Sequence, residues 1–361
     1  MDWTKTTVGE VLPFRYGKGL PDRARSHSGK YKVMSSAGAI DTHDEALTSG
    51  PTVVVGRKGS IGTVYYCPEP VFPIDTTFYI EGNDRVDSRF AYYLLGYLPL
   101  DQMNNDSAVP GLNRSHAEHL EISLPPFAIQ QAIAAVLGTL DDKIESNRRI
   151  VELIPQLIRA IVADTLDVES REVRVVDLAE FINGGAFTKG ASGTGRMVIR
   201  IAELNSGPGS STVYSDIDVP KNRTAFFGDL LMSWSGSLGV YRWVLDEAII
   251  NQHIFKVLPS GGYPSWLVFD RLNAVMPVFQ GIARDKATTM GHIQRGHLES
   301  TTIGIPSAES LRQLNVLLAP LWARLLLAEK ENVTLAALRD ALLPELLSGR
   351  IRVPEAGGVP A

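Results

Sequence analysis

The sequence predicts an α+β protein built from two mixed α/β domains that are related by a pseudo-two-fold axis and separated by a long antiparallel two-helix coiled coil. The first observation behind this prediction is a duplication. The segment Val53–Gly62 is an apolar run that ends in Gly-Ser-Ile-Gly, and Leu230–Gly239, about 180 residues later, ends in Gly-Ser-Leu-Gly. The second observation is that each copy is followed by a long segment with apolar residues at spacings of three and four. A repeat of this length indicates a duplicated domain, because solenoid repeats usually span about 20 to 50 residues.

The composition is that of a globular chain. Its 361 residues, of which 44% are hydrophobic, are enough for two or three domains with cores of their own. A single cysteine, Cys67, excludes an internal disulfide framework and a Cys-rich zinc site, and we interpret it as a small core residue. The sequence shows neither a signal peptide nor a run of about 18 apolar residues, so we expect a cytoplasmic protein. The net charge of −5 argues against binding nucleic acid through bulk positive charge, although basic residues cluster between Arg15 and Lys32.

Residues 1–125 form the first predicted domain. Short β-rich runs broken by Gly and Pro are typical of strands joined by tight turns. The expected strands are Thr52–Val55, Val64–Tyr66, Phe78–Ile80 and Leu120–Leu124, and one helix is expected near Phe90–Tyr97. Residues 169–306 repeat this mixed pattern and form the second predicted domain.

Residues 126–168 predict the first long helix. We expect Pro125-Pro126 to begin it, because proline is tolerated in a first helical turn, and Asp167–Ser170 to end it. Pro155 removes a helical hydrogen bond, so we expect a kink or an early end of the helix there. The seam of this predicted coiled coil consists of Ile133, Leu137, Leu140, Ile144, Asn147 and Val151.

Residues 307–349 predict the second long helix, with Ser307 as its N-cap and Gly349 as its C-cap, and residues 350–361 form a tail. Because neither helix can bury its apolar stripe alone, we expect the two to pack against each other. Asn147 and Asn332 lie within the seam, where a polar side chain commonly fixes the register. The alternative is an ordinary pair of amphipathic helices, each packed on a globular core. The second seam consists of Leu314, Leu318, Leu321, Leu325, Asn332 and Leu335.

The sequence contains no convincing catalytic or metal-binding constellation, so we expect a non-catalytic chain without a metal or cofactor of its own. Gly190–Arg196 lacks the Lys and Ser or Thr of a phosphate loop, and His116–His119 lacks the spacing of a zinc-protease helix. Leu124–Phe127 is similar to the Asn-Pro-Pro-Tyr loop of adenine methyltransferases, but a leucine replaces the asparagine. We interpret Asp141-Asp142-Lys143 as the solvated face of the first long helix.

The repeated residues resemble the specificity subunit of type I restriction-modification systems over almost the whole chain. Both long helices resemble the spacer helices of that family through Leu124–Pro126, Leu140–Ile144 and Leu343–Gly349. The two globular parts resemble its target-recognition domains, one at residues 1–125 and one at residues 169–306. The segments that carry this second resemblance are Val55–Ser60, Pro73–Tyr79, Ser107–Arg114, Phe181–Phe187, Ile199–Gly207, Gly228–Ser237 and Asn251–His253.

The resemblance implies a subunit that binds double-stranded DNA and recruits two methyltransferase (modification) subunits, together with restriction subunits that carry translocase and nuclease activity. S-adenosylmethionine, Mg²⁺ and ATP would then belong to the partner subunits. The assembled complex would be an adenine-N6 DNA methyltransferase and an ATP-dependent type I endonuclease. Two reading domains imply a bipartite, asymmetric target. The predicted helix length bounds the distance between the two half-sites at roughly 15 base pairs.

The candidate DNA-binding residues lie in the repeated loops. Arg57, Lys58 and Ser60 flank the turn at Gly59, which favours phosphate binding, although a hairpin turn with solvated charges is an equal alternative. Asn113 and Arg114 in the first copy correspond to Gln294 and Arg295 in the second. All four side chains are suited to bidentate contacts with adenine or guanine.

Further candidates come from the second copy. Trp234 stands where the first copy has Arg57, and it either stacks on a sugar or closes the core with Trp243. His253 is part of Asn251–His253, a segment for which a strand-capping hydrogen-bond network is an alternative role. Lys189 and Ser235 complete the candidate set.

The sequence is also compatible with two other classes of protein. A self-contained nuclease or methyltransferase predicts activity from the isolated chain that depends on S-adenosylmethionine or magnesium. A coiled-coil scaffold or antitoxin-like adaptor predicts partner binding without a preference for any DNA sequence.

Overall fold

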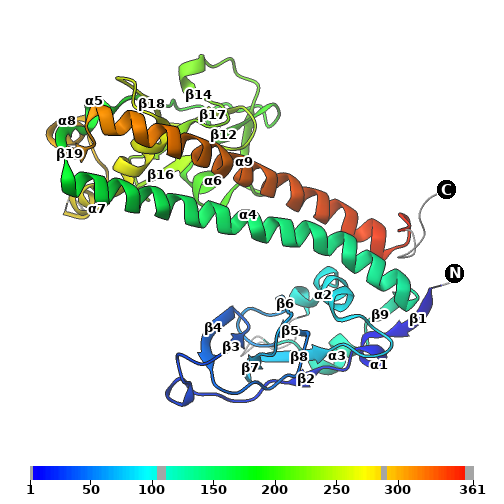
Figure 1. Ribbon diagram of the computed structural model, residues 1–361. Helices are drawn as coiled ribbons and strands as arrows, with labels where there is room; N and C mark the ends of the chain where they lie inside the picture. The colour runs from blue at the N-terminus through cyan, green and yellow to red at the C-terminus, as the bar shows by residue number, and fades with distance from the viewer. Residues whose placement is uncertain (1–2, 104–110, 286–290, 354–361) are drawn as a thin grey trace, which may run out of the picture. The chain divides into compact units, whose positions relative to one another are not determined.

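The computed structural model describes residues 3–103, 111–285 and 291–353 (Figure 1). Residues 107–110 of one segment that carries the family resemblance, and residues 354–361 of the tail, lie outside the described residues. The chain divides into two compact units. Unit 1 comprises Met1–Lys143 and Leu335–Ala361, and unit 2 comprises Ile144–Thr334. Each unit therefore contains a sheet-rich part and a segment of each long helix.

Unit 1 is built on an antiparallel sheet with the order β2-β8-β5-β6. Its central strand contains Val53, Val54 and Val55, three fully buried β-branched residues that favour an extended backbone packed on both faces. A second sheet has the order β4-β3-β7, and β1 pairs with β9. The strands are β1 (Thr4–Thr7), β2 (Arg15–Tyr16), β3 (Tyr31–Ser35), β4 (Gly38–His43), β5 (Thr52–Gly56), β6 (Val64–Cys67), β7 (Phe72–Pro73), β8 (Thr77–Glu81) and β9 (Glu121–Leu124).

Unit 2 repeats this topology. Its sheet β11-β18-β15-β16 has the same order and pairing as β2-β8-β5-β6, and β10 pairs with β19 as β1 pairs with β9. The remaining sheet has the order β13-β12-β17-β14. The strands are β10 (Arg171–Arg174), β11 (Ala179–Asn183), β12 (Arg196–Ile199), β13 (Val213–Ser215), β14 (Thr224–Ala225), β15 (Leu230–Ser233), β16 (Gly239–Arg242), β17 (Ala248–Ile250), β18 (Ile254–Pro259) and β19 (Thr302–Ile305). The duplication in the sequence is thus a duplication of fold.

Helices complete both units. In unit 1 the side chain of Asp87 caps α2 by accepting a hydrogen bond from the backbone N–H of Phe90. The shorter helices of unit 1 are α1 (Val8–Val11), α2 (Ser88–Tyr97) and α3 (Arg114–Glu118), with 3₁₀ turns at Asp22–Ala24 and Leu100–Gln102. Those of unit 2 are α5 (Val175–Leu178), α6 (Ile201–Ser206), α7 (Ser265–Asp285) and α8 (Arg295–Ser300), with a 3₁₀ turn at Lys221–Arg223. The strands predicted around Val53, Val64, Phe78 and Ile122 and the helix predicted near Phe90 are confirmed.

The two long helices are α4 (Phe127–Val168) and α9 (Ala308–Leu347). Within unit 2 they run side by side and antiparallel, because Asn147 near the start of the α4 segment contacts Glu331, whereas Glu169 just after α4 contacts Ser307 (Figure 1). Ser307 is the N-cap of α9, as expected, since its hydroxyl accepts from the backbone N–H of Ser310 at 3.2 Å. The expected early end at Pro155 is wrong: α4 continues through this proline for more than three further turns.

The seam residues contribute to the core of their own unit. In unit 1, Ile133 and Leu137 pack with Leu346 and Leu347 of α9 in the core of the first globular part. In unit 2, Leu318 and Leu325 of α9 share a core with Ile154 and Ile158 of α4. This core also contains Trp266 of α7, which is fully buried. Among the seam residues, Ile133, Leu137, Ile144, Asn147, Leu318 and Leu325 are buried, and Leu140, Val151, Leu314, Leu321, Asn332 and Leu335 are half-buried.

Asn147 is fully buried on α4 and is hydrogen-bonded on both sides of its amide. Its Nδ2 donates to Glu331 at 2.8 Å, and its Oδ1 accepts from Arg324 at 2.9 Å. Asn332 differs, because its Oδ1 is buried without a hydrogen-bond partner in the described part of the chain. Asn147 is therefore the seam asparagine whose polar contacts depend on the register of the two helices.

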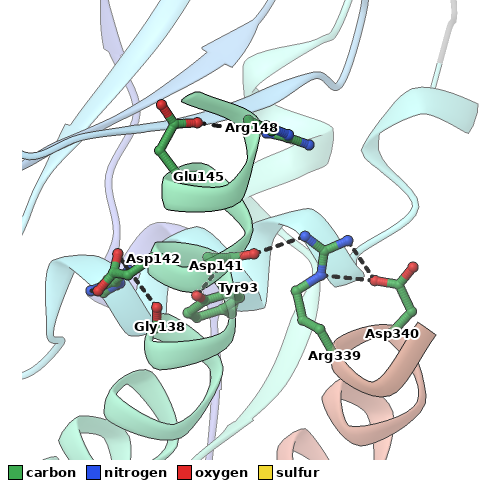
Figure 2. A network of polar contacts seen from close by, with 9 residues as sticks. Tyr93, Gly138, Asp141, Asp142, Glu145, Arg148, Arg339 and Asp340 are labelled. Atoms are coloured by element: carbon green, nitrogen blue, oxygen red, sulfur yellow. Dashed lines mark hydrogen bonds and ion pairs between the residues drawn. The ribbon is translucent and has the colours of Figure 1, made fainter. Parts of the chain in front are cut away.

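Asp141 is not on a solvated face, contrary to the sequence interpretation of Asp141-Asp142-Lys143. Tyr93 of α2 and Arg339 of α9 both point at its carboxylate (Figure 2) and donate hydrogen bonds of 2.6 and 2.8 Å. The neighbouring Asp142 is 69% exposed and pairs with Arg89. Burial, reinforced by the hydrogen bond to Asp141, raises the pKa of Tyr93, so its hydroxyl stays protonated and remains a donor.

Candidate nucleic-acid interface

In unit 1 the candidate loop follows β5 and turns at two glycines with left-handed backbones, Gly59 (φ 78°) and Gly62 (φ 71°). A Cβ on Gly62 would lie 2.3 Å from the backbone nitrogen of Asp101, so this close approach requires glycine. The hydroxyl of Thr63 ties the loop to its neighbours by donating to the carbonyls of Ser36 and Ser60. The loop is thereby held as a fixed turn from which Lys58 and Ser60 are exposed.

A second segment is hydrogen-bonded to this loop. The N–H of Leu112 donates to the carbonyl of Arg57 at 2.8 Å, and Lys58 forms a β-bridge with Gly111. These bonds bring the predicted residues Arg57 and Arg114 together, although 56 positions separate them in the sequence.

Two guanidinium groups flank one exposed aromatic ring in unit 1. Tyr16 at the end of β2 is 51% exposed. The Cζ atom of Arg57 lies 5.0 Å from the centroid of the Tyr16 ring, and that of Arg114 lies 5.8 Å from it. Arg57 also lies over Phe78, and Arg114 donates to Glu118 at 2.9 Å. Cation–π contacts hold both cations at the surface without burying their charge.

Asn113, predicted as a base-reading residue, caps α3 by accepting a hydrogen bond from the N–H of His116 at 3.2 Å. The cap fixes the direction of the amide, while the residue as a whole remains exposed. The structure thus gives Asn113 a structural role that the sequence prediction did not include.

Unit 2 builds the same arrangement from different side chains. The N–H of Ile293 donates to the carbonyl of Trp234 at 3.0 Å, and Ser235 forms a β-bridge with His292, which repeats the bonds at Arg57 and Lys58. Gln294 and Arg295 begin α8 as Asn113 and Arg114 begin α3. Both are exposed, and Arg295 pairs with Glu299 at 3.6 Å as Arg114 pairs with Glu118.

Trp234 packs on the sheet rather than on Trp243. Its ring lies 4.9 Å from that of His253 and 5.9 Å from that of Phe255, whereas Trp243 belongs to a separate apolar cluster. Closure of the core with Trp243 is therefore wrong. In the described part of the chain, the indole Nε1 of Trp234 and Nδ1 of His253 are buried without hydrogen-bond partners.

The remaining predicted residues occupy different environments. Lys189 is exposed in the loop after β11, whereas Ser235 is buried, so its hydroxyl is not presented at the surface. His253 has a left-handed backbone (φ 73°), and its carbonyl accepts from the N–H of Trp234 at 3.0 Å. Oδ1 of Asn251 and Nδ1 of His253 have no hydrogen-bond partners in the described part of the chain, so this backbone bond does not by itself establish the capping network.

Sequence reasoning missed Tyr16. The residue pairs with Phe78 in the β2–β8 register, and this pairing places its ring within 5.0 Å of Arg57 and 5.8 Å of Arg114. The corresponding pairing in unit 2 joins Asn183 to Phe255, so asparagine takes the position of the tyrosine. An aromatic residue directly after the basic Arg15 was the available signal, and it is a weak one.

Asp22, His27 and Asp41 form a group in unit 1 whose ligand atoms all lie within 4.8 Å of one another. His27 Nδ1 is 2.7 Å from Asp41, and the Arg25 guanidinium is 3.0 Å from Asp22 and 3.7 Å from Asp41. The Arg25 guanidinium already pairs with both carboxylates, so the group suits an internal ion-pair network better than a metal ion. Across residues 3–103, 111–285 and 291–353, no helix is long and apolar enough to cross a bilayer.

The fold and these paired loops define the class of the protein: a duplicated α+β protein with two long helices. Known proteins with similar sequences belong to one family with a DNA specificity domain. Residues 1–156 match the type I restriction modification DNA specificity domain. The type I restriction enzyme MjaIX specificity subunit of Methanocaldococcus jannaschii is 22% identical over 347 residues, which cover 84% of this chain and 78% of that protein. The EcoDI specificity subunit of Escherichia coli is 21% identical over 266 residues, covering 70% of this chain and 59% of that protein.

The fold is shared with a solved structure, the S subunit of a type I restriction-modification system from M. genitalium. The TM-score is 0.70 at 16% sequence identity, and the match covers 96% of each chain. The chain is thus HsdS-like: its residues 1–156 match the family's DNA specificity domain, and most of its length is similar to type I specificity subunits.

Proposed function

We propose that this chain is the non-catalytic subunit that gives a type I restriction-modification complex its DNA sequence specificity. The observation that carries the proposal is the repeated loop pair, which has the same backbone connections but different side chains in each unit. Contacts with DNA phosphates alone would not require different side chains in the two units, because phosphates are the same in every sequence. A chain that reads two different half-sites requires them, because base edges are distinguished by side-chain chemistry. The target is therefore bipartite and asymmetric, with an unread gap.

Within each unit we assign different roles to the candidate residues. Lys58 and Ser60 are exposed on a turn whose backbone approaches its surroundings closely, which suits phosphate contacts. Arg114 and Arg295 occupy equivalent positions at the start of a short helix and remain at the surface, which suits contacts with guanine. The cation–π contact of Arg57 with Tyr16 restricts the movement of its side chain, which lowers the entropic cost of binding DNA.

Partners and cofactors follow from the same proposal. Two methyltransferase subunits and restriction subunits would assemble with this chain in the cytoplasm. S-adenosylmethionine, Mg²⁺ and ATP would bind to those partner subunits and not to this chain. The relatives named above are specificity subunits of type I restriction enzymes, which supports this division of labour.

The proposal is tested by selecting bound duplexes from a randomised DNA library, using the full chain alone and with the modification subunit of the same organism. We expect two defined blocks of bases separated by an unread gap. Partner binding without an enriched sequence would favour a scaffold and contradict the proposal. Methylation or cleavage by the isolated chain, dependent on S-adenosylmethionine or magnesium, would favour a self-contained enzyme and also contradict it.

A further inference from the structure

Unit 2 contains a recess of about 340 Å³ at its candidate loops. Its walls are mainly apolar and aromatic, and they include Phe181, Trp234, Phe255, Ile293 and Leu298. Gln294 and Arg295, both exposed, belong to the same lining. None of the described lining residues is acidic. The recess therefore combines an apolar interior with polar and basic groups that are compatible with DNA.

The equivalent position in unit 1 has different side chains. There Tyr16 stands in place of Asn183, and Arg57 stands in place of Trp234. The Tyr16 ring packs against that of Phe78 at 5.0 Å, and the Arg57 guanidinium lies over both rings. Unit 1 thus presents cations where unit 2 presents a recess lined by aromatic rings.

These two surfaces suit different bases. In the major groove, guanine presents two acceptors that favour arginine, whereas thymine presents a C5-methyl group that is read by apolar contact. An apolar recess next to a side chain capable of hydrogen bonding matches the thymine edge. We propose that the recess around Trp234 determines specificity by taking up the methyl group of one thymine in the half-site read by unit 2. This inference rests on the proposed DNA-recognition function.

The contact is made by the apolar surface of the ring. The indole Nε1 of Trp234 is buried and has no hydrogen-bond partner among the described residues, so it is not available to a base without rearrangement. Trp234→Phe therefore removes no hydrogen bond and retains an aromatic wall, whereas Trp234→Ala removes the wall. The two variants separate the role of the ring from that of its N–H group.

The test uses the full chain, its modification subunit and a labelled duplex that carries the selected target. Each thymine of the target is replaced in turn by deoxyuridine, which lacks only the methyl group. We expect one replacement, in one half-site only, to weaken binding about four-fold, the value for losing one buried methyl group. Trp234→Ala should bind the thymine and deoxyuridine duplexes equally, and Trp234→Phe should still favour thymine. Tyr214→Ala, which removes an exposed aromatic ring of unit 2, is the matched control and should favour thymine as the wild type does.

The outcomes separate this inference from the proposed function. Selective binding of the target with no penalty at any deoxyuridine would overturn the thymine contact and leave the recognition function standing. If no sequence is bound selectively, the recognition function itself fails. A thermal unfolding transition like that of the wild type shows that Trp234→Ala is folded. If this folded variant no longer binds the modification subunit but still binds the deoxyuridine duplex more weakly, the recess binds protein and the inference is wrong.

Discussion

The hydroxyl of Tyr93 on α2 donates a 2.6 Å hydrogen bond to Oδ2 of Asp141 on α4. Arg339 of α9 donates to the other oxygen of the same carboxylate at 2.8 Å, so three helices meet at one charge (Figure 2). Burial by itself lowers the pKa of Arg339, but the hydrogen bonds to Asp141 and Asp340 outweigh it, and the net direction is upward. The guanidinium therefore stays charged, and the network joins the globular part of unit 1 to its helix segments.

Tyr93→Phe should lower the stability of the protein by about 1.5 to 3 kcal/mol, the usual range for a hydrogen bond to a charged group. The phenylalanine keeps the packing of the ring, so the decrease in stability measures the contribution of the hydroxyl alone. Tyr97→Phe is the matched control, because Tyr97 is on the same helix and is 52% exposed. Urea unfolding of both variants measures the difference, and equal midpoints for the two would show that the hydrogen bond contributes nothing.

Asn147→Ala should destabilise the protein by about 1 to 3 kcal/mol, because Glu331 and Arg324 both lose a buried partner. Asn332→Leu should be neutral or stabilising, since it removes a buried oxygen that has no hydrogen-bond partner in the described residues. Thermal unfolding of the two variants checks the contrast. A destabilisation by Asn332→Leu as large as that by Asn147→Ala would contradict it.

Glu169 provides a pH-dependent contact at the start of α9. Hydrogen bonds from Ser310 and Ser307 hold the pKa of this carboxyl below its ordinary value of 4.5. A lowered folded-state pKa means that the contribution to stability is present above about pH 4.5 and is lost as the pH falls through the folded pKa. Glu169→Gln should therefore be less stable than the wild type at pH 7, and the difference should shrink below pH 4.5. A difference that stays constant from pH 7 to pH 3 would exclude this contact as its source.

Lys58→Ala should weaken DNA binding to a similar extent on every sequence and should reduce the slope of log K against log salt by about one. This expectation follows from the phosphate contact that we propose for Lys58, which is exposed on the loop turn. Binding titrations at several salt concentrations measure the slope on target and non-target duplexes. Loss of binding to the target alone, with an unchanged slope, would instead assign Lys58 to a base.

The sequence was sufficient for much of the fold, because the strong signals are local. The run Val53–Val55 predicts a buried strand, and the spacing from Ile133 to Val151 predicts a long amphipathic helix. The pairing of β1 with β9 could not be predicted in this way, since the strand Thr4–Thr7 is polar and half-exposed and has no apolar alternation.

The candidate site was predicted only in part, for a related reason. Arg57 and Arg114 are candidates on sequence alone because their loops recur in the second copy. The ring of Tyr16 and the recess at Trp234 exist only through strand register and loop bridges between distant segments. Asp141 was misinterpreted because a charged residue on a helix normally faces water, and its partners Tyr93 and Arg339 lie far away in the sequence.

The central claim is that each unit reads its own half-site. The most direct test is to map adenine methylation across the genome of cells that express this chain with its modification subunit, using the wild type, Arg114→Ala and Trp234→Ala. We predict two blocks of bases separated by an unread gap for the wild type. Arg114→Ala should relax one block only, and Trp234→Ala should relax only the other. A single continuous block, or a change in both blocks caused by either variant, would contradict the claim.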